Sequence, residues 1–261
     1  MKLAVSNIAW SAGYDDEIYK FLCENNFKGL EIAPTRIFPD KPYDNLARGK
    51  SFAHKLREEY NLEIASLQSI WFGITESVFG SDADRRKLFD YTKKAVDFAH
   101  ELNCANLVFG CPKNRAVPPD FDNYLPVAYD FFNKAGDYAA DCGTCIAIEP
   151  NPPIYNTNFI NTSAEAFDFC RRLNNPGIKV NADLGALIYN NENLEILKNN
   201  IDLINHLHIS EPYLAPLEKR ELHGELKYLN YEKFLSVETA NINDINAVKA
   251  NIIYIKEVYG I

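Results

Sequence analysis

Four side chains that could bind a divalent metal ion stand at the ends of short apolar segments in the second half of the sequence. Glu149, Asp183, His208 and Glu238 each close a segment that contains β-branched residues and runs into a loop. Three carboxylates and one imidazole suit a hard or borderline cation such as Mn²⁺, Mg²⁺, Co²⁺ or Zn²⁺. Any one of them alone could be a polar strand end that meets solvent. The four together predict a site for one divalent metal ion.

Strand-like and helix-like segments alternate along the chain and would bring these residues together. Apolar residues recur at three- and four-residue steps in the helical segments, as over 82–102. The expected strands are 2–7, 28–33, 62–68, 106–109, 145–149, 179–183, 204–208 and 235–238. The expected helices are 15–24, 49–60, 82–102, 123–142, 163–173, 194–199 and 244–258, with one helical turn at 231–234.

This alternation predicts an α/β fold with parallel strands joined by right-handed crossovers. Eight strand–helix units favour a closed (β/α)8 TIM barrel over an open doubly wound sheet. No Gly-x-Gly-x-x-Gly turn follows the first strand, so a dinucleotide-binding fold is not indicated. The active site of such a barrel lies at the C-terminal ends of its strands. The ends that carry Glu149, Asp183, His208 and Glu238 would therefore converge.

Bulk composition fits one soluble domain over residues 1–261. The chain has 261 residues, of which 47% are hydrophobic, and its formal net charge is −9. Without a basic cluster, a nucleic-acid partner is not expected. The first residues enter a strand-like segment directly, and no apolar run is long enough to cross a bilayer, so neither a signal peptide nor membrane association is expected. Six scattered cysteines fit a reducing cytoplasm, and a homo-oligomer is compatible with the sequence.

The order of these motifs resembles the xylose isomerase-like TIM barrel superfamily, the sugar phosphate isomerase/epimerase and AP endonuclease 2-like group. The resemblance covers essentially the whole chain. The matching segments are Ser6-Asn7-Ile8-Ala9-Trp10, Gly29-Leu30-Glu31-Ile32, Ile146-Ala147-Ile148-Glu149-Pro150-Asn151-Pro152, Asn181-Ala182-Asp183-Leu184-Gly185, His206-Leu207-His208 and Ser236-Val237-Glu238. Their spacing is typical of the superfamily and does not identify a substrate.

The resemblance implies that Glu149, Asp183, His208 and Glu238 bind the metal ion. It also implies that Glu149 and Glu238 are catalytic, one removing a proton next to a carbonyl and the other returning it. Ketose epimerases of this group usually have a substrate-contacting His three residues after the Asp, where this chain has Ala186. The Arg that usually follows the His on the seventh strand is also missing.

Further residues near the strand ends are candidates for substrate binding. Glu31 could bind substrate or orient a neighbouring side chain, and Gln68 ends the third strand. Lys113 and Arg115 follow the fourth strand and could hold a phosphate or carboxylate, although they could equally be solvated loop cations. The remaining candidates are Asn151, Glu211 and His223. We expect His206 to be a buried structural residue directed to the side of its strand away from His208.

Together these observations predict a metal-dependent isomerase or epimerase of a small carbohydrate or sugar phosphate. One alternative is an inosose dehydratase-like lyase, which would use the same site to expel water. Another is a barrel without catalytic activity that binds a metabolite, although an intact set of four ligands argues against it. An endonuclease IV-like nuclease would need several more His ligands. The chain has five histidines and a net negative charge, so this function is not expected.

Overall fold

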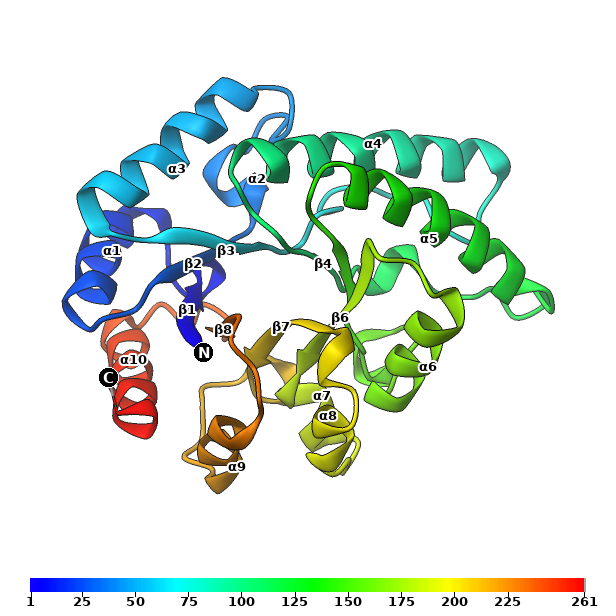
Figure 1. Cartoon of the computed structure of the whole chain (residues 1–261). Coiled ribbons are helices and arrows are strands. Elements are labelled where there is room, and N and C mark those ends of the chain that lie inside the picture. The colour runs from blue at the N-terminus through cyan, green and yellow to red at the C-terminus, as the bar shows by residue number, and fades with distance from the viewer. Residues whose placement is uncertain (261) are drawn as a thin grey trace.

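The computed structural model describes residues 1–260 and is a closed barrel of eight parallel strands in sequence order (Figure 1). Strand β1 pairs with both β2 and β8, which closes the barrel. The predicted (β/α)8 TIM barrel is therefore confirmed, as one domain. The strands are β1 Lys2–Ser6, β2 Gly29–Ile32, β3 Glu63–Leu67, β4 Leu107–Phe109, β5 Ile146–Ile148, β6 Ile178–Asp183, β7 Ile204–Ile209 and β8 Phe234–Val237.

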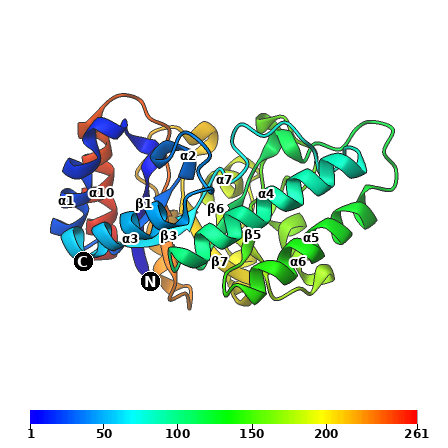
Figure 2. The same cartoon turned by 90° about the horizontal axis from the view of Figure 1, so that it is seen from above.

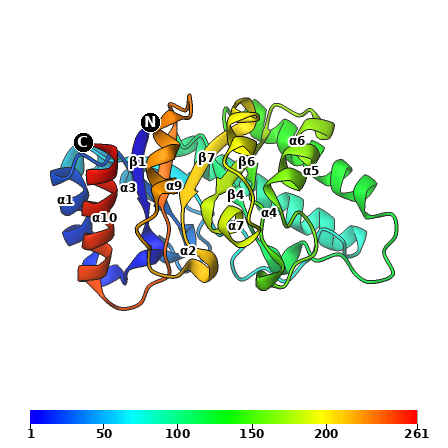
Figure 3. The same cartoon turned by 90° about the horizontal axis from the view of Figure 1, so that it is seen from below.

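The helices surround the barrel as an outer layer (Figures 1 and 2). Helices α1 and α10, from opposite ends of the chain, lie side by side (Figure 3). The α-helices are α1 Asp15–Glu24, α2 Pro34–Ile37, α3 Leu46–Tyr60, α4 Asp82–Glu101, α5 Tyr124–Asp141, α6 Ser163–Leu173, α7 Leu184–Tyr189, α8 Glu195–Lys198, α9 Glu221–Glu225 and α10 Ile245–Tyr259. None of the described helices is long and apolar enough to span a membrane.

Local sequence explains where the longer helices begin and end. Ser81 with Asp84 and Thr162 with Glu165 form capping boxes at the starts of α4 and α6. After α6, Asn174 adopts the left-handed conformation that commonly follows a helix. The apolar faces of these helices pack on the barrel and form one continuous core. The strand ends are thus held on a rigid support.

The short helices differ from the prediction. Helices α2, α7 and α9 were not expected, and the segment 231–234, where a helical turn was predicted, is not helical and leads into β8. A helix of four to six residues shows too few turns to produce a clear apolar period. Asp183 caps α7 directly at the end of β6, so no loop separates this strand from its helix.

Candidate metal centre

The four side chains of the predicted ligand set lie together at the C-terminal ends of β5, β6, β7 and β8. One ligand atom from each of Glu149, Asp183, His208 and Glu238 can be chosen so that all four lie within 4.8 Å of one another. The Nδ1 atom of His208 is 3.0 Å from Glu149 Oε1, 3.1 Å from Glu238 Oε2 and 3.8 Å from Asp183 Oδ2. We call these four residues the carboxylate–histidine cluster.

Strand register and neighbouring groups fix the orientation of Asp183. A register shift between β6 and β7 sets Asp183 directly beside His208. Its Oδ1 atom accepts a hydrogen bond from the Ala186 amide at 2.5 Å, and its Oδ2 atom accepts one from Ser210 Oγ at 2.6 Å. The Ser210 hydroxyl in turn accepts from the Gly185 amide. The carboxylate is therefore ordered by the start of α7 and by the loop after β7.

Amide side chains hold both glutamates of the cluster: Asn151 and Asn181 bind the two oxygens of Glu149, whereas Gln68 binds one oxygen of Glu238. Asn151 donates to Glu149 Oε2 at 3.0 Å, and Gln68 donates to Glu238 Oε1 at 2.8 Å. The other oxygen of each glutamate is the one near His208 Nδ1. Gly110 makes room for this arrangement, since a Cβ atom there would lie 2.7 Å from Glu149 Oε2.

Burial, together with the crowding of negative charge, shifts the pKa values in the cluster. Burial, reinforced by the Glu149 carboxylate, raises the pKa of Asp183 to about 7. Burial also raises the pKa of Glu238. Burial would lower the pKa of His208, but the Glu238 and Glu31 carboxylates outweigh it and raise that pKa well above its usual value. The cluster favours extra positive charge at its centre, and this donor set fits a divalent cation.

Glu31 orients His208 from below the cluster. Its Oε2 atom accepts from His208 Nε2 at 2.9 Å and lies 3.2 Å from His206 Nε2, and the Glu31 side chain is fully buried. Burial alone would raise the pKa of Glu31, but the adjacent His208 outweighs burial and holds that pKa below its usual range. An ionised Glu31 holds a proton of His208 on Nε2, so that Nδ1, which faces the carboxylates of the cluster, is the nitrogen that could bind a metal ion.

We expect Glu31→Gln to weaken metal binding by about 10–100-fold, the usual effect of losing a partner of a metal-binding histidine. Glutamine keeps the shape of the side chain but can present its amide nitrogen to His208 and no longer carries the negative charge. Isothermal titration with Mn²⁺ and Zn²⁺ measures the change, and thermal unfolding of the metal-free protein checks the fold. Unchanged affinity in a folded variant would show that Glu31 does not control the ligand atom.

A cavity of about 200 Å³ opens above the cluster. It is smaller than the roughly 300–1,000 Å³ typical of pockets for drug-sized ligands, so it suits a small molecule. Its polar walls include Gln68, Asn151 and Tyr155, and the Asn151 Oδ1 atom has no hydrogen-bond partner among residues 1–260. Three cluster carboxylates line the cavity, and no lysine or arginine of the described chain does.

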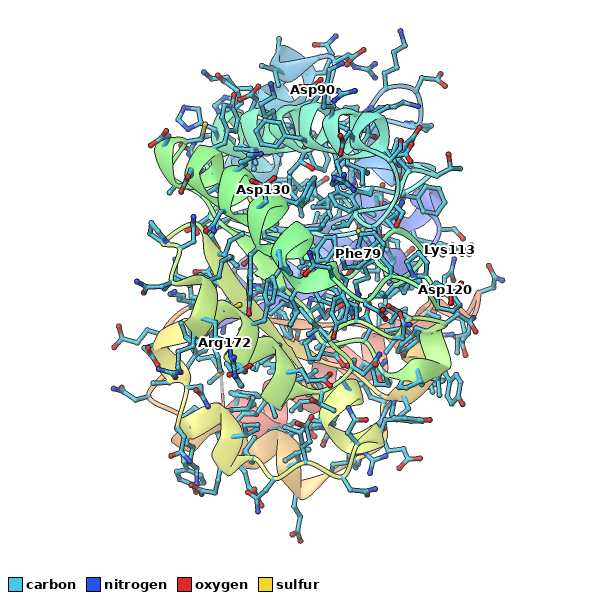
Figure 4. All side chains as sticks on the ribbon, turned by 90° about the vertical axis from the view of Figure 1, so that its right-hand side faces the viewer. Phe79, Asp90, Lys113, Asp120, Asp130 and Arg172 are labelled. Atoms are coloured by element: carbon cyan, nitrogen blue, oxygen red, sulfur yellow. The ribbon has the colours of Figure 1, made fainter. Side chains whose placement is uncertain are left out.

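Lys113 and Arg115 do not form the predicted anion-binding pair. Arg115 is fully buried and donates to the backbone carbonyls of Glu149 at 2.8 Å and Ile160 at 3.3 Å. Burial lowers its pKa to about 10, and its guanidinium also packs over the ring of Phe109. Lys113 is exposed and lies near the edge of the molecule (Figure 4). Arg115 therefore supports the backbone at the end of β5 and does not face the cavity.

Glu211 and His223 do not line the cavity either. The Glu211 carboxylate is paired with the Arg220 guanidinium at 2.6 Å and 2.7 Å, and His223 Nδ1 lies 2.9 Å from the hydroxyl of Tyr254. Both side chains are buried under the link between β7 and β8. Their selection as substrate-binding candidates is not supported by this geometry, because each side chain has its polar partner within this link or on α10 and neither lines the cavity.

The prediction that His206 points away from His208 was also wrong. Residues two positions apart in a strand share a face, and both imidazoles contact Glu31. His206 is buried, as expected, and its Nε2 atom is 2.8 Å from Ser236 Oγ.

The site includes residues that were not singled out from the sequence. Asn181 donates to Glu149 Oε1 at 2.7 Å. It lies two residues before Asp183 on β6, so strand alternation could have predicted that the two side chains share a face. Ser210 lies two residues after His208, and the same rule applies. Tyr155 comes from a short 3₁₀ turn after β5, for which the sequence gives no comparable signal.

Comparisons with known proteins agree with this fold. The profile of the family described as "Xylose isomerase-like TIM barrel" matches residues 20–257. No curated protein sequence matches the chain significantly. Among solved structures, 3-keto-D-glucoside 4-epimerase from E. coli has 19% identity and a TM-score of 0.78 over 100% of both chains.

Two further structures show the same architecture. D-psicose 3-epimerase from Clostridium cellulolyticum H10, solved with D-tagatose, has 14% identity and a TM-score of 0.79 over 100% of this chain and 97% of that one. AP endonuclease, family 2, from Brucella melitensis has 19% identity and a TM-score of 0.70 over 93% and 94% of the two chains. At these identities the likeness concerns the fold.

Proposed function

This chain belongs to the xylose isomerase-like TIM barrel family, and from that premise we propose that it is a metal-dependent isomerase or epimerase of a small carbohydrate. The observation that carries the proposal is the carboxylate–histidine cluster, with four potential ligand residues from four consecutive strands under one small cavity. Similar structures include two whose names describe sugar epimerases.

Glu149, Asp183, His208 and Glu238 would hold the metal ion. When bound, a divalent cation supplies positive charge that stabilises an enolate formed next to a substrate carbonyl. Glu149 and Glu238 are the proposed acid–base pair, because they come from β5 and β8 and approach the centre from different sides of the barrel mouth. One removes a proton from the carbon beside the carbonyl, and the other returns a proton to the intermediate.

Amide side chains prepare both glutamates for this role. Asn151 and Gln68 each bind one carboxylate oxygen, and the other oxygen lies near His208 Nδ1. That other oxygen of Glu149 also accepts a hydrogen bond from Asn181. Gln68 also donates to Ser6 Oγ and to Glu31, so it links Glu238 to the residue that orients His208. These contacts restrict the rotation of the glutamates, as acid–base chemistry at a fixed substrate carbon requires.

The cavity favours a sugar that carries no phosphate group on the portion bound inside the cavity. Three carboxylates line the cavity, and no lysine or arginine of the described residues does. All the charged side chains that a phosphate would meet there are therefore negative. The dehydratase alternative uses the same proton removal and differs in the fate of the intermediate, so it is an outcome of the experiment below.

We expect the metal-loaded protein to catalyse the exchange of one substrate proton with solvent deuterium. A screen of free ketoses, ketose phosphates and 3-keto-glucosides in D₂O with Mn²⁺, Mg²⁺, Co²⁺ or Zn²⁺, followed by NMR, measures this. Deuterium in a product isomer of unchanged composition supports isomerisation or epimerisation. Loss of water from the substrate would assign a lyase, and no exchange with any metal would overturn the proposed function.

A further inference from the structure

A second groove adjoins the cavity, and we propose that it binds a ring attached to the reacting sugar, which makes the substrate a glycoside. A glycosidic bond removes the carbonyl at the anomeric carbon, so the ketone of the reacting ring lies at another ring carbon. This inference rests on the proposed function for the identity of the reacting sugar. The groove has a volume of about 490 Å³ and is formed by the loops after β3 and β4. We call it the outer groove, and its walls include Trp71, Phe72, Thr75, Cys111 and Lys113.

The outer groove and the cavity share a wall. Ser69, Cys111 and Pro112 line both spaces. Ser69 and Cys111 have positive φ angles of 52° and 40°, which are uncommon for residues other than glycine. Such a conformation persists only where the surrounding structure holds it. The two loops that form the shared wall therefore hold a defined shape, and a molecule longer than one sugar ring could extend from the cavity into the groove.

Phe72 offers an aromatic face to that molecule. Its side chain is 70% exposed, although most other large apolar side chains of the chain are buried. Beside it, Gly73 has a φ angle of 82°, and the position of a Cβ atom there is open space. The turn is therefore not covered by other described side chains at Gly73. A flat ring can cover this exposed apolar surface and remove it from water.

The cavity and the outer groove differ in charge, and this difference suits a glycoside with its reacting ring at the carboxylates and its second ring in the groove. Glu149, Asp183 and Glu238 line the cavity, whereas no carboxylate among residues 1–260 lines the outer groove. Lys113 is exposed at the groove and forms no ion pair within the described residues. Its ammonium group can donate to an oxygen of a second sugar ring. Lys113, which the sequence suggested as a ligand for a phosphate or carboxylate, is thus proposed to bind the substituent of the reacting sugar.

Binding of paired glycosides tests the proposal directly. The probes are the methyl, phenyl and glucosyl glycosides of glucose, galactose and mannose, titrated calorimetrically into the Mg²⁺-loaded protein. We expect at least one phenyl and one glucosyl glycoside to bind about tenfold more tightly than the methyl glycoside of the same sugar. Ring-bearing probes that bind no better than methyl glycosides, or do not bind at all, would overturn the proposal.

Two substitutions assign the contacts. Phe72→Ala should remove the tenfold preference for ring-bearing probes and leave methyl glycosides unaffected. Lys113→Ala should weaken the glucosyl probes severalfold but not the phenyl probes, which offer no oxygen on the second ring. Tyr228→Ala, which removes an aromatic side chain that is 81% exposed outside the groove, is the matched control. A preference for ring-bearing probes that survives Phe72→Ala would overturn the assignment of the groove.

Failure of the outer-groove proposal can be distinguished from failure of the proposed function. Deuterium exchange on free ketoses without any preference for ring-bearing glycosides would reject the outer groove and keep the isomerase. A ring preference that depends on Phe72, without proton exchange on any substrate, would reject the isomerase and keep the groove as a glycoside-binding site.

Discussion

Replacement of either Glu149 or Glu238 by glutamine is expected to slow proton exchange on the substrate by about 10²–10⁴-fold, the usual contribution of general acid–base catalysis. Glutamine preserves the size of the side chain, and its amide oxygen can still accept the hydrogen bond from Asn151 or Gln68. It cannot take a proton from carbon at neutral pH. The measurement is the rate of deuterium incorporation at saturating metal concentration, so that weaker metal binding does not account for the loss.

The matched control for this experiment is Glu63→Gln. Glu63 is an exposed residue at the start of β3, at the end of the barrel opposite the cluster, and its partner is the exposed Lys2. This variant should exchange protons at the rate of the unmodified protein. If either cluster variant kept near-normal exchange with metal bound, proton transfer by paired glutamates would be wrong.

Removal of one cluster ligand is expected to lower metal affinity by more than about 100-fold. Loss of a mere hydrogen-bond partner of a metal ligand already costs 10–100-fold, and loss of the ligand itself should cost more. The unmodified protein should bind one divalent ion per chain. Elemental analysis after desalting and titration calorimetry with Mn²⁺ and Zn²⁺ measure stoichiometry and affinity in Asp183→Ala and His208→Ala.

A conservative variant separates ligand loss from damage to the fold. Asp183 also caps α7 through Ala186, so alanine can destabilise that helix by about 1 kcal/mol. Asp183→Asn keeps a capping oxygen but removes the charge, and it should still bind metal weakly. Exposed Asp90 and His54 provide control substitutions to alanine. A full metal content in both Asp183→Ala and His208→Ala would reject the ligand assignment.

The barrel and the gathering of the cluster could be predicted because both depend on local patterns. Eight apolar segments that alternate with amphipathic helices leave few topologies, and parallel strands bring their C-terminal ends together. Side chains at these strand ends are therefore brought together by the backbone. Glu149, Asp183, His208 and Glu238 therefore meet, although about ninety residues separate the first from the last.

Loop residues could not be predicted because their orientation depends on distant partners. The sequence shows that Arg115 and Glu211 are charged, but not that one supports the carbonyl of Glu149 and the other pairs with Arg220. A buried charge satisfied by its own neighbours is unavailable to a substrate. His206 is a different case, because strand alternation by itself places it on the same face as His208 and the error could have been avoided.

All four cluster residues come from β5 to β8, whereas the outer groove is built by the loops after β3 and β4. The two halves of the barrel thus contribute different walls to one opening. Insertions or substitutions in the segment from Phe72 to Thr75, which lies outside the buried core, can therefore alter the shape of the entrance while the cluster stays in place. For protein engineering, this segment is the natural position for loop libraries intended to change substrate scope, because its variation leaves the scaffold of the chemistry untouched.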